Sequence, residues 1–216
     1  MADLITLKDP RSPAAEAYRV LRTSIQFAAI DSPIRTLVVT SPAADEQRSV
    51  ALANLAVTMA QGGHETILVD ADLRRPAQHA IWGLPNARGL TSMILDEGGI
   101  TNPPLQTVGI ERLSVLTSGP LPPNPADLLG ARRMEEAIAA LRERSDYVLF
   151  DAPPVLAVTD TALLATKLDA LLLVVRAGGT RRDHAQRAKA VLARAHVRII
   201  GVALTNAPRD ASTSTY

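Results

Sequence analysis

The feature that most constrains this chain is a set of short, uninterrupted apolar runs separated by segments with helical spacing. Apolar residues fill consecutive positions of each run instead of every second one. That pattern is typical of strands covered on both faces, as in a parallel sheet. We therefore expect six buried strands, at Thr36–Thr40, Thr66–Asp70, Leu113–Thr117, Tyr147–Asp151, Ala170–Arg176 and Val197–Leu204.

Three segments between these runs have helical character: Gln47–Gln61, Ala131–Arg144 and Arg181–Ala195. The first ends at Gly62-Gly63, a common helix stop. Strands that alternate with helices form right-handed βαβ units. We predict an α/β fold, a three-layer α-β-α P-loop NTPase-like domain with a mainly parallel sheet, over residues 1–210. Residues 211–216 are expected to be a short flexible tail, and Ser118–Gly130 a loop with one short helix.

Composition excludes several classes of function. The net charge is +1, which gives no electrostatic case for nucleic acid. The chain has no cysteine, which excludes disulfides, thiolate metal sites and a cysteine nucleophile. No apolar stretch reaches the length of about 18 residues that a membrane span needs, and no signal peptide is visible. We expect a cytoplasmic protein.

The loop after the first expected strand lies where a P-loop would cradle phosphates. A working loop uses glycines, so that backbone N–H groups can approach the phosphates, then a lysine and a Ser/Thr hydroxyl. Here Asp45 and Gln47 stand at the glycine positions, Arg48 at the lysine and Ser49 at the metal-binding hydroxyl. An Asp carboxylate repels phosphate, and the planar Arg fork does not replace a lysine. Taken alone, this loop reads as an ordinary strand–helix connection.

Two other strands end in aspartates. Asp70 and Asp72 leave the second strand together and could orient a hydroxyl or organise magnesium; the alternative is a solvated turn with capping carboxylates. Asp151 ends the strand YVLFD, as in a Walker-B arrangement near magnesium. Ligands gather at the carboxyl ends of parallel strands, so these groups are expected to converge.

In this order the motifs resemble the cytoplasmic domain of bacterial tyrosine kinases (BY-kinases) of the CpsD/CapB-like type, which regulate capsule and exopolysaccharide synthesis and export. The resemblance covers nearly the whole chain, from SPAAEAYRVLRTSIQF through ILVDADLRRP, GLTSMI and TSGPLPPNPADLLG to FDAPPVLAVTDTALLATKLDALLLVVRAGGTRRD. It implies that Asp70 and Asp72 act on a tyrosine hydroxyl and the metal. Asp151 would be the Walker-B residue, and Ser49 would complete a magnesium site with Asp70 and Asp151.

The resemblance also implies partners. Glu16, Arg19 and Arg22 match the family's subunit-contact motif and form one stripe of a helix. The stripe would dock on a second copy or an active paralogue; without the resemblance it reads as a solvated face with local ion pairs. A membrane-bound activator of the polysaccharide co-polymerase type would hold the protein at the inner face of the membrane.

This sequence departs from the family pattern in three places. They are the residues that would bind the phosphates, the tyrosines that would be phosphorylated, and the residue that would recognise the adenine base. The Walker-A glycines and lysine are replaced, as described above. The tyrosine-rich tail is reduced to Tyr216, the remaining phosphoacceptor candidate. The last strand commonly ends in an adenine-binding Asn, but here Thr205 stands at that position and Asn206 follows it.

These departures favour a pseudokinase with weak or absent ATP binding that regulates or scaffolds polysaccharide export. One alternative is an active ATP- and magnesium-dependent tyrosine autokinase; another is a deviant-Walker positioning ATPase. If magnesium is absent, Asp70, Asp72 and Asp151 repel one another. We therefore predict an ion pair between Arg48 and an aspartate.

Overall fold

A computed structural model describes residues 3–44 and 47–207. Seven strands form one sheet in the order β3-β4-β2-β5-β1-β6-β7. Every neighbouring pair is parallel except β3 and β4. The strands are β1 (Thr36–Thr40), β2 (Thr66–Asp70), β3 (Gln106–Thr107), β4 (Leu113–Leu116), β5 (Tyr147–Asp151), β6 (Ala170–Arg176) and β7 (Ile199–Thr205).

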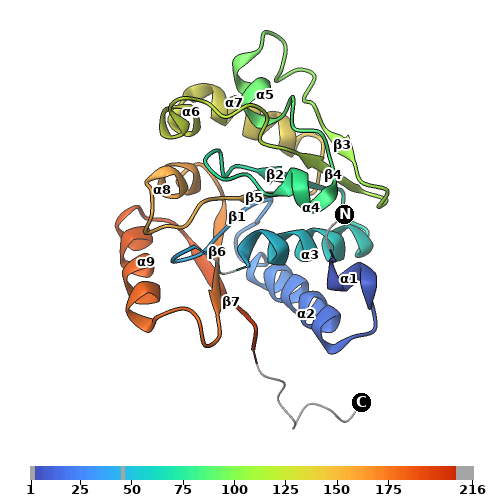
Figure 1. The fold of residues 1–216 in the computed structure, drawn as a ribbon, viewed down its shortest axis with the longest axis vertical. Helices are drawn as coiled ribbons and strands as arrows, with labels where there is room; N and C mark the ends of the chain where they lie inside the picture. The colour runs from blue at the N-terminus through green and yellow to red at the C-terminus, as the bar shows by residue number, and fades with distance from the viewer. Residues whose placement is uncertain (1–2, 45–46, 208–216) are drawn as a thin grey trace.

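Helices cover both faces of the sheet, which confirms the predicted three-layer architecture (Figure 1). One face is packed by α1 (Ile5–Lys8), α2 (Pro13–Ala28), α3 (Arg48–Gln61) and α4 (Gln78–Trp82); the other is packed by α5 (Leu90–Leu95), α6 (Pro125–Gly130), α7 (Arg132–Arg142), α8 (Asp160–Ala165) and α9 (Arg182–Arg194). Within the described residues, no helix is long and apolar enough to cross a bilayer.

The two cores explain why the apolar runs are continuous. Leu37 and Val39 of β1 pack under α2 and α3, whereas Val38 packs under the helices of the opposite face. Leu149 and Phe150 of β5 divide in the same way. Because successive side chains point to opposite faces and both faces are buried, each position of such a strand must be apolar.

The structure differs from the sequence prediction in a few elements. The last strand runs over Ile199–Thr205 and not over Val197–Leu204, and the antiparallel β3 was not predicted. The helix predicted from Gln47 begins at Arg48, with Gln47 as its N-cap. The loop Ser118–Gly130 does contain one short helix, α6. The predicted tail 211–216, including Tyr216, lies outside the described residues.

Candidate active site

Two neighbouring strands, β2 and β5, bring the predicted acidic residues to one edge of the sheet. Asp70 at the end of β2 and Asp151 at the end of β5 are direct register partners. Val39, near the end of β1, is the register partner of Asp151 on its other side. Asp72 follows β2 by two residues, and all three carboxylates are almost fully buried. The predicted convergence of the aspartates is confirmed.

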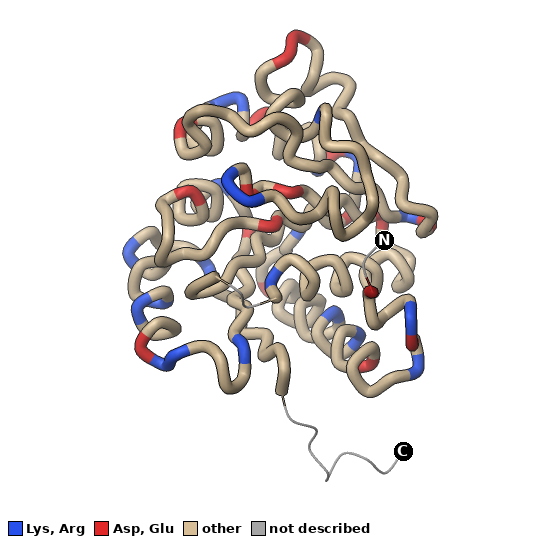
Figure 2. The backbone as a smooth tube through the Cα atoms, in the orientation of Figure 1, with Lys and Arg blue, Asp and Glu red and all other residues tan. Residues whose placement is uncertain are grey.

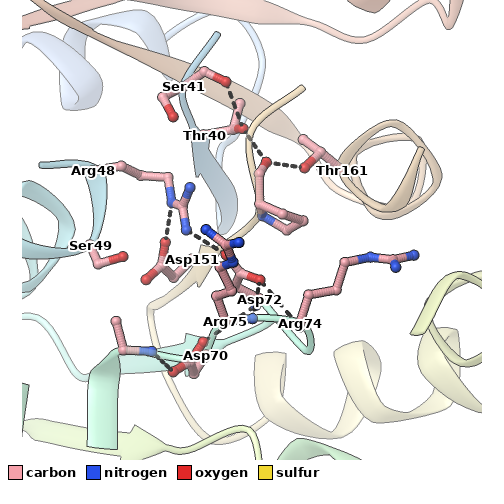
Figure 3. Close-up of polar contacts among 12 residues, drawn as sticks. Thr40, Ser41, Arg48, Ser49, Asp70, Asp72, Arg74, Arg75, Asp151 and Thr161 are labelled. Atoms are coloured by element: carbon pink, nitrogen blue, oxygen red, sulfur yellow. Dashed lines mark hydrogen bonds and ion pairs between the residues drawn. The ribbon is translucent and has the colours of Figure 1, made fainter. Parts of the chain in front are cut away.

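Arg48 lies directly between two of these carboxylates (Figure 3). Its Nε donates to Asp151 Oδ1 over 2.8 Å, and its Nη2 donates to Asp72 Oδ2 over 2.7 Å. The arginine side chain is only 10% exposed. This arrangement confirms the predicted ion pair between Arg48 and an aspartate. Arg48 is the first residue of α3, so the helix following β1 aims its guanidinium at the edge where β2 and β5 end.

The electrostatics of the cluster are those of charges removed from water. Burial works to lower the pKa of Arg48, but the carboxylates of Asp151 and Asp72 outweigh it and raise that pKa. Burial, together with the charge of Asp151, raises the pKa of Asp70 well above its ordinary value. Three acids and one arginine therefore share a site in which the guanidinium is the central positive charge.

Asp70 is also held by backbone N–H groups. Its Oδ2 accepts hydrogen bonds from the N–H groups of Ala77 and Gln78, at 2.9 and 2.8 Å. These groups open α4, so Asp70 ties the start of that helix to the end of β2. The alternative prediction was a solvated turn with capping aspartates. Asp70 does accept hydrogen bonds from these N–H groups, but it is fully buried, so the turn is not solvated there.

Gln78 completes the shell around Asp151, and sequence reasoning missed it. Its Nε2 donates to Asp151 Oδ2 over 2.8 Å and to the Ser49 carbonyl over 3.1 Å. The Trp82 indole Nε1 donates to Gln78 Oε1 over 3.1 Å and so fixes which way the amide points. Both oxygens of Asp151 are consequently occupied, one by Arg48 and one by Gln78.

A second ion pair, also missed, lies beside the cluster and joins an exposed arginine to a buried aspartate. Arg74 donates from Nε and Nη2 to the two oxygens of Asp160, at 2.8 and 3.0 Å. Asp160 is fully buried at the start of α8. The pair connects the loop after β2 to α8. The acidic cluster therefore lies between α4 on one face of the sheet and α8 on the other.

These carboxylates, as arranged, do not fit magnesium. Mg²⁺ takes carboxylate oxygens and water in a near-octahedral shell, but both oxygens of Asp151 already accept hydrogen bonds, from Arg48 and Gln78. Asp72 Oδ2 accepts a hydrogen bond from Arg48, and Asp72 Oδ1 accepts hydrogen bonds from the backbone N–H groups of Arg74 and Arg75. Across residues 3–44 and 47–207, no group of three or more His, Asp or Glu side chains could hold a metal. The magnesium ligands expected for an active kinase stay a prediction.

The loop that precedes α3 keeps a backbone conformation suited to glycine. Gln47 has φ 57° and ψ 23°, in the left-handed region. A non-glycine residue there is strained by about 1 kcal/mol. Asp45, the other replaced glycine position, lies outside the described residues.

We expect Gln47→Gly to raise the free energy of unfolding by about 0.5–1 kcal/mol, because glycine adopts this φ without strain. Urea unfolding measures the change. The matched control is Gln186→Gly, the same replacement at an exposed position inside α9, which should lower stability by about 1 kcal/mol. A loss of stability at position 47 as large as at 186 would contradict the strain.

The predicted subunit-contact residues make contacts inside this chain. Arg19 pairs with Glu16 over 2.6 Å. Arg22 turns instead toward α3, where its Nη1 donates to the Thr58 carbonyl over 2.8 Å. A Cβ at Gly62 would lie 2.7 Å from that nitrogen, so the glycine makes room for the arginine. Arg22 thus neutralises the C-terminal end of α3, and the role of the stripe in subunit contact stays a prediction.

The residues at the expected base-binding position lie at the end of β7, two strands from β1. Thr205 is the register partner of Arg176. Asn206 has φ 52°, and its Nδ2 donates to the Ala177 carbonyl over 3.3 Å. Asn206 therefore links the residue after β7 to the residue after β6, and its role in base recognition stays a prediction.

Comparison with known proteins assigns the family. No protein-family model matches the chain. It is 38% identical over 214 residues to the tyrosine-protein kinase YwqD of Bacillus subtilis, covering 99% of this chain and 90% of that protein. Among solved structures, the kinase domain of Escherichia coli tyrosine kinase ETK superposes with a TM-score of 0.90 and 31% identity, covering 100% of this chain and 84% of that one. The chain belongs to the BY-kinase family.

A chimeric protein, CapA2B2, superposes on this BY-kinase domain with a TM-score of 0.89 and 36% identity, covering 95% of this chain and 90% of that one. The septum site-determining protein MinD of Pyrococcus horikoshii gives a TM-score of 0.65 at 20% identity. At that identity the likeness shows the P-loop NTPase-like fold alone.

Proposed function

We propose that this chain is a regulatory BY-kinase homologue of capsule or exopolysaccharide synthesis whose nucleotide site binds ATP weakly or not at all. One observation carries the proposal: the Arg48 guanidinium is already bound to Asp151 and Asp72 in the nucleotide-free fold. A magnesium-bound nucleotide would need those carboxylates, so Arg48 would first have to leave them.

The cost of that step decides the expected affinity. Breaking a buried ion pair while its partner stays buried costs about 3–5 kcal/mol. The cost is subtracted from the binding free energy, and about 1.4 kcal/mol corresponds to a tenfold change in affinity. Binding is thus expected to be weaker by a factor of roughly 100 to 4,000 than in a site whose carboxylates are not held by Arg48.

The active-kinase alternative has support of a different kind. The relatives YwqD and ETK are named tyrosine kinases, and the names favour this alternative. Asp70, Asp72 and Asp151 are all present here. For activity, Arg48 would have to turn from the carboxylates to the phosphates. The positioning-ATPase alternative has only the shared fold in its favour.

A membrane-associated partner forms part of the proposal. The name of the chimera CapA2B2 pairs a CapA part with a CapB part, which supports an activator of CapA type for this chain. Such a partner would bring the protein to the inner face of the membrane, and the chain would act there by assembly and not by phosphate transfer.

The proposal is tested by a phosphotyrosine assay. The wild-type chain, incubated with Mg-ATP alone and with a CapA-type activator, is expected to show no incorporation at Tyr216. The YwqD kinase, assayed in parallel, is the positive control. Activator-dependent label on Tyr216 that disappears in Asp151→Asn would establish the active kinase instead.

A further inference from the structure

A basic surface on α9 is not used by the acidic site or by any contact described above. Residues 181–198 contain six of the chain's 23 Lys and Arg residues but one of its 22 Asp and Glu residues. The remaining 17 cations and 21 acids leave the rest of the chain with a net charge of −4. A nearly neutral protein therefore concentrates positive charge on one helix, where Figure 2 shows Lys and Arg positions along α9.

Most of this charge has no partner. Arg181 pairs with Asp183, the single acid of the segment. Arg198 donates to the carbonyls of Ser32 and Ala28. The four cations within α9 are exposed, and none has an ion pair or side-chain hydrogen bond within the part of the chain that the structure describes; we call Arg182, Arg187, Lys189 and Arg194 the α9 basic face. Other cations of the chain do have carboxylate partners, such as Lys167 with Glu135 and Arg74 with Asp160.

The arrangement of these side chains favours a flat partner. At 100° per residue, Arg187 and Arg194 lie on one flank of the outer face, and Arg182 and Lys189 lie on the other. The exposed residues between the flanks are Asp183, Gln186, Ala190 and Ala193, which have shorter side chains. The Asp183 carboxylate is neutralised by its ion pair with Arg181. The shorter side chains form a low ridge along α9, which is about 20 Å long. The long Lys and Arg side chains on both sides of this ridge can therefore contact the same flat surface. The ridge is convex, so it offers no groove for a peptide.

We propose that the α9 basic face binds the anionic lipid surface of a membrane. The contact is electrostatic and peripheral, because the ridge carries no bulky apolar side chain that would enter the hydrocarbon. Each cation near such a surface strengthens binding about fivefold. The four together hold the domain weakly and reversibly, which suits a chain that also needs a protein partner to stay there.

Vesicle sedimentation tests the proposal, without nucleotide or activator, so its outcome does not depend on the state of the kinase site. Wild-type protein is expected to sediment with vesicles of 70% phosphatidylcholine and 30% phosphatidylglycerol at about 50 mM salt, and not with pure phosphatidylcholine. About 500 mM salt should release it, since the Debye length then falls to a few ångströms.

A quadruple variant isolates the surface. Arg182→Gln, Arg187→Gln, Lys189→Gln and Arg194→Gln together should weaken partitioning more than a hundred-fold. The control, with the same net charge, replaces four exposed cations elsewhere: Lys8→Gln, Arg11→Gln, Arg132→Gln and Arg133→Gln. It should partition within a few-fold of wild type. Thermal unfolding checks that both variants fold.

Three results would overturn the proposal. The first is no sedimentation of wild-type protein at low salt, and the second is equal loss of binding in the two variants. The third is retention by soluble polyglutamate with no preference for anionic vesicles, which would assign an acidic protein to this face.

Discussion

Arg48→Ala is expected to lower the free energy of unfolding by about 3 kcal/mol at pH 8, a large effect for one side chain near the surface. The arginine is the central cation among Asp70, Asp72 and Asp151, whose carboxylates are almost fully buried. Without it, the carboxylates stay desolvated and repel one another. Chemical denaturation at fixed pH gives the difference directly.

The loss should depend on pH in a definite direction. The pKa of Asp70 is already raised by burial and by the charge of Asp151, and removing the nearby positive charge of Arg48 raises that pKa further. For an acid whose folded pKa lies above its unfolded value, the stabilising contribution is fully present below the unfolded pKa, near 4, and is lost as pH rises through the folded pKa. The difference between Arg48→Ala and wild type should therefore shrink toward pH 4 and be largest above neutrality.

Two controls separate this cause from ordinary loss of packing. Arg132→Ala, at a side chain 89% exposed, should change stability by less than about 0.5 kcal/mol. Adding Asp72→Asn to Arg48→Ala should recover part of the stability at pH 8, because one of the unpaired charges is gone. If Arg48→Ala behaves like Arg132→Ala at every pH, the ion pairs of Arg48 with Asp72 and Asp151 do not form in solution.

Restoring the Walker-A residues should produce the largest gain in nucleotide affinity. We expect the triple variant Asp45→Gly, Gln47→Gly and Arg48→Lys to bind Mg-ATP at least a hundred-fold more tightly than wild type. An Asp carboxylate about 4 Å from a phosphate charge is unfavourable by about 4 kcal/mol at an effective dielectric near 20. Lysine is a compact charge on a flexible stem, without the planar fork that arginine uses to hold two carboxylates.

A double variant, Asp45→Gly and Gln47→Gly with Arg48 retained, shows which change matters. The double variant removes the repulsion of Asp45, so any further gain in the triple variant measures the effect of releasing Asp72 and Asp151 from Arg48. Equal affinities of wild type and triple variant, measured by calorimetry, would mean that the native loop was never the obstacle to nucleotide.

The sequence predicted the sheet well because the signal is redundant there. Leu37, Val38 and Val39 must all be apolar when both faces of the sheet are covered, so the continuous apolar run predicts a buried parallel strand. β3 was missed because its two residues, Gln106 and Thr107, are polar and pair only at the edge. Helices as short as α4 are too brief to show a period.

The acidic cluster was predictable because Asp70 and Asp151 end apolar strands and Asp72 follows Asp70 by two residues. The pairing of β2 with β5 then brings the three together. Gln78 was not predictable, since it meets Asp151 across 73 residues through a side-chain amide that belongs to no motif. Arg22 shows the limit of a helical wheel: it shares a stripe with Glu16 and Arg19, yet its guanidinium reaches Thr58 in the neighbouring helix. The one available hint was Gly62, whose missing side chain leaves room there.

The most direct test of the account is calorimetric titration of the wild-type chain with Mg-ATP and Mg-ADP at neutral pH. With Arg48 bound to Asp151 and Asp72, we predict no heat of binding at micromolar nucleotide, and a Kd of millimolar order if any is measurable. A micromolar Kd for either nucleotide would contradict the account, because it would show that the guanidinium leaves both carboxylates at little cost.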